Sequence, residues 1–214
     1  MFFKNVKIRT KLTIAFTTLV MLIMLGSSFA LMGLNSANQD IHDVVDDIYP
    51  ATVKANLLIN NFNEFIIFQQ LTMLDEQGRL ASEQESKKAE ITAKVAQLLK
   101  ELEETAHDDE SKKILAEVYE IRQKYITSQN FVVKAFNENN RHVAVNELIT
   151  KTAGIQLMYR DKLLEFIALQ NQKMNKAGEA VERDFIEKRV FLVLLTLISI
   201  IVGSVLGWFI TNGI

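Results

Sequence analysis

The stretch LTIAFTTLVMLIMLGSSFALMGL, residues 12–34, decides how this chain is organised, together with VFLVLLTLISIIVGSVLGWFI, residues 190–210. Neither stretch contains a charged side chain. Each is as long as the roughly 20 residues that a helix needs to cross a bilayer core of about 30 Å. A backbone inside hydrocarbon must satisfy its own hydrogen bonds, so both stretches are predicted to be transmembrane helices. Residues 35–189 then form one large loop between two membrane anchors.

The tail before the first anchor predicts which side of the membrane the loop occupies. Residues 1–11 contain no acidic side chain and four basic ones, Lys4, Lys7, Arg9 and Lys11. Short basic segments stay in the cytoplasm. Both termini are therefore expected inside, with residues 211–214 as the start of a cytoplasmic linker, and residues 35–189 outside. In a bacterium with two membranes, this is a multi-pass protein of the inner membrane with a periplasmic loop.

A cleaved secretory signal is the alternative to an anchor at residues 12–34. Ser28, Phe29 and Ala30 place small residues where cleavage could occur. The apolar run is longer than the roughly 7–15 residues of such signals, and helical periodicity continues past it without a break. An uncleaved anchor is the favoured interpretation.

Composition favours helices and excludes several classes of function. One proline and eight glycines in 214 residues indicate long helices rather than a β-rich loop. With 24 basic and 26 acidic side chains, the chain has no excess of positive charge that would attract nucleic acid. It has no cysteine, hence no disulfide framework and no thiolate metal site.

No catalytic constellation is visible. His42, His107 and His142 stand alone, without a second metal ligand at helical spacing, and are predicted to be surface residues. Neither a glycine-rich phosphate loop nor a nucleophile elbow occurs. We expect no enzyme, no cofactor and no metal site.

Apolar residues recur at spacings of three and four throughout the loop, which is typical of packed helices. Breaks at 75–78, 106–109 and 137–140 divide the loop into four helices. The fold class expected is therefore all-α, an antiparallel up-down four-helix bundle flanked by two transmembrane helices. The predicted inward seam of the third helix is Ile114, Val118, Ile121, Tyr125, Ser128, Val132 and Ala135. That of the fourth is Ala153, Leu157, Arg160, Leu164, Ile167, Asn171, Met174, Gly178, Val181 and Phe185.

Pro50 lies inside the first helix of the loop. Proline lacks the backbone N–H and its ring crowds the carbonyl one turn earlier. The sequence therefore predicts a kink or interruption near Asp46, as a tolerated bend in preference to a gating hinge.

The far half of the first loop helix is apolar nearly all round, which indicates burial on several sides. A four-helix bundle covers only one stripe of each helix, so a second copy of the chain could cover the rest. We predict a homodimer whose interface includes Ile59, Phe62, Phe65 and Ile66.

Uncharged polar residues on the same helix suggest a ligand site near that interface: Asn56, Asn60, Asn63 and Gln70. An amide stripe that only sets the register of packing is the favoured alternative. Arg160 falls on the predicted inward seam, where it could bind an anionic ligand, pair with a carboxylate such as Glu64, or extend to the bundle edge. Tyr125 and Tyr159 could line the same interior, with a core role as the default.

Small residues at a spacing of four mark both predicted anchors. Ser199, Gly203 and Gly207 form such a ladder in the second anchor, and Gly26 and Ala30 form a weaker one in the first. Small residues let helix backbones approach closely in lipid. Close packing of the anchors, within or between subunits, is expected.

The order of these features resembles the sensory half of a bacterial methyl-accepting chemotaxis receptor with a four-helix-bundle periplasmic domain. The residues that carry the resemblance are Lys7–Leu12, Tyr49–Ala51 and Leu57–Glu64, followed by three more helices and a second anchor. It implies a homodimer, recognition of a small molecule near the membrane-distal dimer interface, and piston-like movement of the fourth helix. It also implies control of a cytoplasmic chemotaxis kinase complex through a linker and signalling domain that would follow residue 214.

The chain departs from relatives that bind amino-acid carboxylates, which use arginines in the distal part of the first loop helix. No arginine lies between Arg9 and Arg79. A neutral or apolar ligand, or a periplasmic binding protein, is therefore favoured. Two other functions stay open: the input region of a membrane histidine kinase or diguanylate cyclase, and a structural or adaptor membrane protein without a small-molecule ligand.

Overall fold

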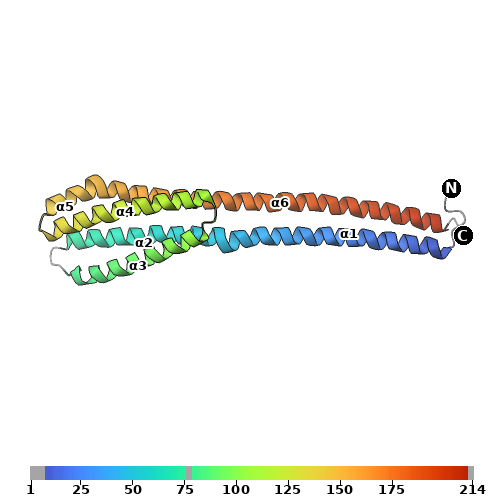
Figure 1. Ribbon diagram of the computed structural model, residues 1–214, viewed down its shortest axis with the longest axis horizontal. Helices are drawn as coiled ribbons and strands as arrows, with labels where there is room; N and C mark the ends of the chain where they lie inside the picture. The colour runs from blue at the N-terminus through green and yellow to red at the C-terminus, as the bar shows by residue number, and fades with distance from the viewer. Residues whose placement is uncertain (1–7, 76–78, 212–214) are drawn as a thin grey trace. The chain divides into compact units, whose positions relative to one another are not determined.

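The computed structural model describes residues 8–75 and 79–211, and every regular element within them is helical (Figure 1). The elements are α1 (Ile8–His42), a π-helical segment (Asp43–Ile48), α2 (Tyr49–Leu74), α3 (Ala81–Thr105), α4 (Asp109–Asn137), α5 (Arg141–Glu147), a second π-helical segment (Leu148–Thr152) and α6 (Ala153–Thr211). The chain divides into two compact units. One is Val44–Asn175, and the other combines α1 with the part of α6 from Lys176 onward.

The first unit is a four-helix bundle in which α5 and the beginning of α6 together supply the fourth helix (Figure 1). Its core is closed by side chains with almost no exposed surface, among them Leu58, Leu102, Val118, Leu163 and Phe166. The helix boundaries fall at the three predicted breaks. At the last of them Asn139 adopts a φ of 60°, a left-handed conformation that asparagine tolerates and that ends α4. The all-α bundle predicted from the sequence is confirmed.

The inward seam predicted for α4 is confirmed at every position, since all seven of its residues are buried. The seam predicted for α6 is wrong. Leu157, Arg160 and Leu164 are exposed, and Tyr159, Leu163 and Phe166 are buried in their place. Both faces of this helix carry apolar residues at helical spacing, and the face with the two aromatic rings fills the bundle interior.

Pro50 interrupts helical geometry where the sequence predicts it. The six residues Asp43–Ile48 form a π-helix, and α2 begins at Tyr49 with the proline in its first turn. The wider π turn accommodates the missing N–H of the proline and the crowding against the Asp46 carbonyl. The second π-helical segment has no comparable sequence signal. There the Thr152 hydroxyl lies 2.7 Å from the Ser128 hydroxyl of α4, inside the bundle.

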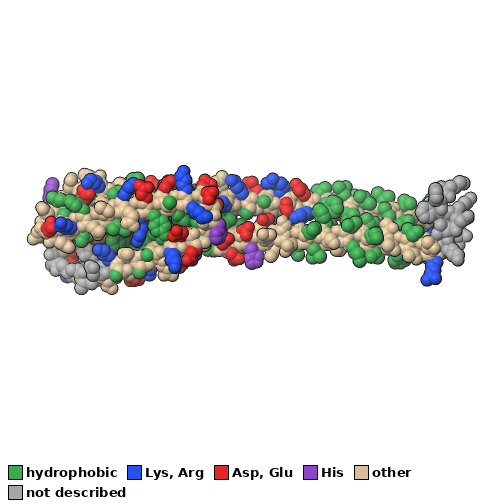
Figure 2. All heavy atoms as spheres, in the orientation of Figure 1, with side chains coloured by type: hydrophobic (Ala, Val, Ile, Leu, Met, Phe, Trp, Pro, Cys, Tyr) green, Lys and Arg blue, Asp and Glu red, His purple; other side chains and the backbone are tan. Residues whose placement is uncertain are grey.

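In the second unit, α1 packs against the distal part of α6. The rings of Phe29 and Phe191 lie 4.1 Å apart between centroids. Gly33 permits the close approach, because a Cβ atom there would lie 2.7 Å from Cδ of Lys188. Among the described residues, two helices are long and apolar enough to cross a membrane, by length and composition. Figure 2 shows the hydrophobic side chains gathered along them.

Candidate functional site

A cavity of about 190 Å³ lies inside the four-helix bundle, and all four helices contribute to its wall. Its lining residues are Phe62 and Phe65 of α2; Lys88, Ile91, Thr92 and Val95 of α3; Arg122, Tyr125, Ile126, Gln129 and Asn130 of α4; and Tyr159 of α6. Thr92 and Asn130 are exposed, whereas Phe62, Tyr125 and Tyr159 are buried. The cavity therefore opens between α3 and α4 and ends against α2 and α6.

Three aromatic rings form the deep wall of this cavity. The Phe62 ring lies 4.9 Å from the Tyr125 ring, in an edge-to-face arrangement, and 4.7 Å from the Tyr159 ring. Aromatic pairs at such separations are attractive beyond the area they bury. Because α2, α4 and α6 each supply one ring, this cluster also fixes the three helices relative to one another.

Three polar atoms on the cavity wall are buried without a hydrogen-bond partner in the described part of the chain: Oη of Tyr125, Oη of Tyr159 and Oε1 of Gln129. Their residues are only 6%, 2% and 5% exposed. Burial raises the pKa of Tyr159 to about 12. Burial also raises the pKa of Tyr125 against a small opposing effect of the Gln156 amide, which does not reach hydrogen-bond geometry. Such orphaned groups are costly and are normally satisfied by some partner.

A smaller cavity of about 80 Å³ adjoins the first and shares Phe65, Lys88 and Gln129 with it. Gln69 of α2 contributes a further orphaned donor there, its amide Nε2, counting only partners among the described residues. The polar groups are thus concentrated along one path through the bundle.

Two basic side chains, Lys88 and Arg122, stand at the opening of the larger cavity, and both are half-buried. Neither has an ion pair with another described residue. No aspartate or glutamate belongs to the described lining of either cavity. The opening therefore carries a positive electrostatic potential. Solvent screens this potential less than it would for fully exposed charges, because both side chains are half-buried.

The structure brings together only two of the residues that the sequence suggested for ligand binding. Tyr125 and Tyr159 line the same interior, as predicted. The four amides, Asn56, Asn60, Asn63 and Gln70, are exposed on the outer side of α2. Arg160 does not point inward: it is exposed and its Nη2 lies 3.1 Å from Oδ1 of Asp161. Whether any of these residues binds a ligand stays a prediction.

The four residues predicted at a dimer interface belong to the bundle of a single chain. Phe62 is in its core, and Ile59, Phe65 and Ile66 pack against that core. Apart from Tyr49 at its first position, the large apolar residues that α2 leaves exposed are different ones: Val53, Leu57, Ile67, Leu71 and Leu74. With Asn60 and Glu64 they follow a strict four–three spacing, the heptad pattern of a coiled-coil seam.

A polar cluster joins the start of α4 to α6. The Asp108 carboxylate accepts a hydrogen bond of 2.9 Å from the Ser111 N–H and pairs with Lys173. The buried Ser111 hydroxyl in turn accepts hydrogen bonds from Lys173 (2.7 Å) and Gln170 (3.0 Å). Burial alone would raise the pKa of Asp108, but the hydrogen bonds from Lys173 and Ser111 outweigh it and lower the pKa to about 2.

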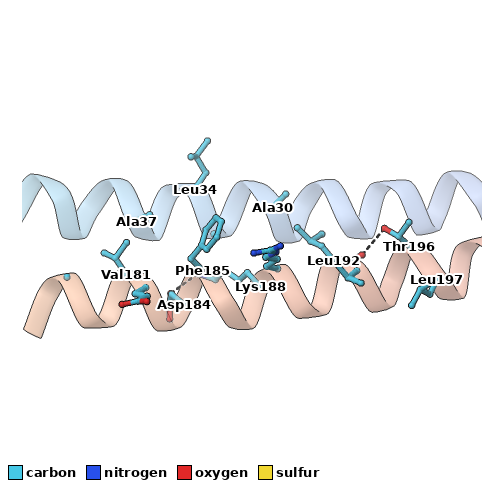
Figure 3. A pocket seen from close by; sticks show the side chains of 15 residues that line it. Ala30, Leu34, Ala37, Val181, Asp184, Phe185, Lys188, Leu192, Thr196 and Leu197 are labelled. Atoms are coloured by element: carbon cyan, nitrogen blue, oxygen red, sulfur yellow. Dashed lines mark hydrogen bonds and ion pairs between the residues drawn. The ribbon is translucent and has the colours of Figure 1, made fainter.

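The unit formed by α1 and distal α6 has a groove of about 860 Å³ between these helices (Figure 3). Along the groove, Nζ of Lys188 forms an ion pair with Oδ2 of Asp184 at 2.7 Å (Figure 3). The Ser36 hydroxyl also donates to Asp184, at 3.4 Å. Of the predicted ladder residues, Gly26, Ala30 and Gly203 lie toward the partner helix. A Cβ atom at Gly207 would meet no described side chain within 4 Å, and the Ser199 hydroxyl bonds back to the Leu195 carbonyl.

Sequence reasoning named Tyr125 and Tyr159 but missed other polar residues of the two cavities, Gln69, Lys88, Arg122 and Gln129. Gln69 lies three residues after Ile66 and Gln129 lies four residues after Tyr125, so an amide at helical spacing from apolar residues was an available signal. Lys88 and Arg122 gave no signal in the sequence, because a basic residue on an amphipathic helix is ordinarily solvated. His42, His107 and His142 are exposed, as predicted. Among the described residues, no group of three or more His, Asp and Glu side chains could hold a metal ion.

Comparison with known proteins supplies the family. A search of curated proteins and a search of solved structures each found no match. The profile of a four-helix-bundle sensory module for signal transduction matches residues 5–184, which include the whole bundle. The chain therefore belongs to the family of four-helix-bundle sensory modules for signal transduction, the kind of module typical of methyl-accepting chemotaxis receptors.

Proposed function

We propose that this chain is the sensor region of a transmembrane chemoreceptor, which detects a stimulus outside the inner membrane and passes it to the cytoplasm for chemotaxis. One observation carries the proposal. The bundle that matches the sensory family is flanked in sequence by two helices long and apolar enough to cross a bilayer.

The surface of α1 and distal α6 supports a lipid environment for both. Met32 of α1 and Ile201 of α6 are 71% and 63% exposed, and their apolar neighbours are similar. Such a surface is unfavourable in water and favourable in hydrocarbon. The basic tail that contains Arg9 and Lys11 orients both termini toward the cytoplasm. The bundle then lies in the periplasm.

Continuity of α6 supports transmission along a helix. Its first residues, including Tyr159, Leu163 and Phe166, form part of the bundle core, and the same helix continues to Thr211 through the apolar stretch. A helix resists compression along its axis, because every turn is closed by backbone hydrogen bonds. A displacement of α6 in the bundle would therefore be carried along this helix.

The exposed heptad seam of α2 supports a homodimer. Leu57, Ile67 and Leu71 are each more than two-fifths exposed, although such residues at heptad spacing are ordinarily covered by a partner helix. A second copy would present the same seam, since two-fold dimers use one patch on both subunits. We propose that α2 pairs with α2 of the second subunit along this face.

A chimaera tests sensing. The chain, joined at Thr211 to the kinase-control part of a chemoreceptor, should give stimulus-dependent kinase activity when cells are screened with a metabolite panel. Ala180→Pro should abolish the response while the bundle stays folded, because proline interrupts α6 outside the bundle; Ala180→Ser is the matched control. A chimaera that ignores every metabolite and binding protein would favour an adaptor role instead.

Topology is tested separately with single cysteines, which the chain lacks naturally. In intact spheroplasts, a membrane-impermeant maleimide should label Lys113→Cys, and Arg9→Cys should react only after permeabilisation. The reverse pattern would contradict the periplasmic placement.

A further inference from the structure

We propose that the cavity between α3 and α4 is a binding site within each single bundle for a small planar organic anion, one unsaturated ring that carries a carboxylate. That the bound molecule acts as a signal rests on the proposed function. That the molecule binds is inferred from the cavity alone.

The volume sets the size of the ligand. An apolar protein cavity of about 150 Å³ is large enough to bind benzene. At about 190 Å³, this cavity has room for one six-membered ring and a small substituent.

The deep wall selects a ring. Phe62, Tyr125 and Tyr159 already make edge-to-face and tilted contacts with one another, with centroids less than 5 Å apart. A further planar ring can extend this cluster with the same geometry. A flexible aliphatic ligand of equal size would lose more conformational entropy on entering and gain no aromatic contact.

The polar groups select a carboxylate. Arg122 presents a guanidinium that can hold two carboxylate oxygens at once, and Lys88 adds a second positive charge at the opening. Oη of Tyr125 and of Tyr159 can each donate a hydrogen bond. Both hydroxyls are protonated at neutral pH, since a tyrosine pKa is ordinarily about 10 and burial raises it further at these two positions. The described lining contains no acidic side chain that would repel the anion.

The position of the cavity gives such binding a consequence. Tyr159 lies on α6, the helix that continues into the second apolar stretch, while Lys88 and Arg122 lie on α3 and α4. A ligand that contacts all of them couples the separation of α3 and α4 to the position of α6. This is a site inside one subunit, distinct from a site shared across a dimer.

The test uses the full chain in lipid nanodiscs and isothermal titration calorimetry, with empty nanodiscs as the blank. The probes are benzoate, benzamide, which keeps the ring and removes the charge, and acetate, which keeps the charge and removes the ring. We expect saturable binding of benzoate with one site per chain, and at least tenfold weaker binding of the other two. A ratio of one benzoate per two chains would assign the site to the dimer interface and overturn the proposal.

Variants place the binding in the cavity. Arg122→Gln should weaken benzoate binding at least tenfold, whereas Lys124→Gln, an exposed lysine of α4 paired with Glu120, should change it less than twofold. Val95→Phe, which fills the cavity from α3, should abolish binding, and circular dichroism checks that each variant keeps its helices. The proposal fails if no probe binds, if Arg122→Gln has no effect, or if Arg160→Gln removes binding instead.

The outcome also separates this site from the wider function. Absence of benzoate binding, with a chimaera that still responds to another stimulus, would overturn the site and leave the sensor intact. The converse outcome is benzoate binding that depends on Arg122 in a chain whose cysteine labelling contradicts the topology. That outcome would support the binding site and overturn the proposed receptor function.

Discussion

Removal of the Tyr159 hydroxyl should make the ligand-free protein more stable. This side chain is 2% exposed, and its Oη has no hydrogen-bond partner among the described residues. A buried hydroxyl without a partner costs about 1–3 kcal/mol relative to water. Tyr159→Phe keeps the ring, and so keeps its contact with Phe62 at 4.7 Å. We expect the free energy of unfolding to rise by about 1 kcal/mol, at the low end because water can enter the neighbouring cavity.

The assay is thermal unfolding of the full chain in mild detergent, followed by circular dichroism at a helical wavelength. A gain of about 1 kcal/mol corresponds to a rise in melting temperature of about 2–4 °C for a domain of this size. Tyr119→Phe is the matched control. The Tyr119 hydroxyl is near the surface and makes a weak bond of 3.4 Å to Glu103, so its removal should change stability by less than about 0.5 kcal/mol.

The reasoning would be refuted if Tyr159→Phe lowered stability by more than about 1 kcal/mol, the typical net contribution of an intact hydrogen bond. That result would mean that the hydroxyl is satisfied in the folded protein and does not await a ligand. The expected result has a second part: the same variant should bind benzoate more weakly, although it is more stable. Opposite signs for stability and affinity are expected when a polar group is retained for binding.

Three further predictions test the packing. Leu163→Ala should cost about 3 kcal/mol, because this fully buried side chain leaves a cavity, whereas Leu164→Ala, 46% exposed, should cost less than about 0.5 kcal/mol; equal losses in denaturant unfolding would contradict the register of α6. Oxidation of membranes should crosslink subunits through Asn60→Cys but not through Phe62→Cys, and the opposite result on non-reducing gels would move the dimer interface to the predicted residues. Asp108 should stabilise the bundle above pH 4 and lose this effect between about pH 4 and 2, because its pKa falls from 3.8 to about 2 on folding. Its side chain is 43% exposed, so solvent screening reduces the contribution to about 1 kcal/mol, measured as the difference from Asp108→Asn at pH 6. Most of this contribution should be lost at pH 2, where about half of the folded-state carboxylates are protonated.

The orphaned polar groups at the cavity are unfavourable for the stability of the ligand-free bundle. Leucine or phenylalanine at Gln129 would remove an unsatisfied amide and add apolar contact. A bundle selected for stability alone would be expected to carry such residues. Retention of tyrosine and glutamine hydrogen-bonding groups along one path is consistent with a partner that is present only part of the time.

The sequence by itself determined the fold class, the helix boundaries and the two long apolar stretches. These follow from local rules: the spacing of apolar residues, the polar breaks near Gly78 and Asn139, and the chemistry of Pro50. The inward seam of α4 was also predictable, because that helix carries one apolar face and charged residues on the others.

Only the tertiary structure decided which face of α6 turns inward. This helix carries apolar residues on two faces, so periodicity could not choose between Leu163 and Leu164. The choice depends on which side chains fill the space left by the other helices, and that is a property of the whole packing. The candidate site has the same origin, because Lys88, Arg122 and Tyr159 come from three helices and meet only when the bundle closes.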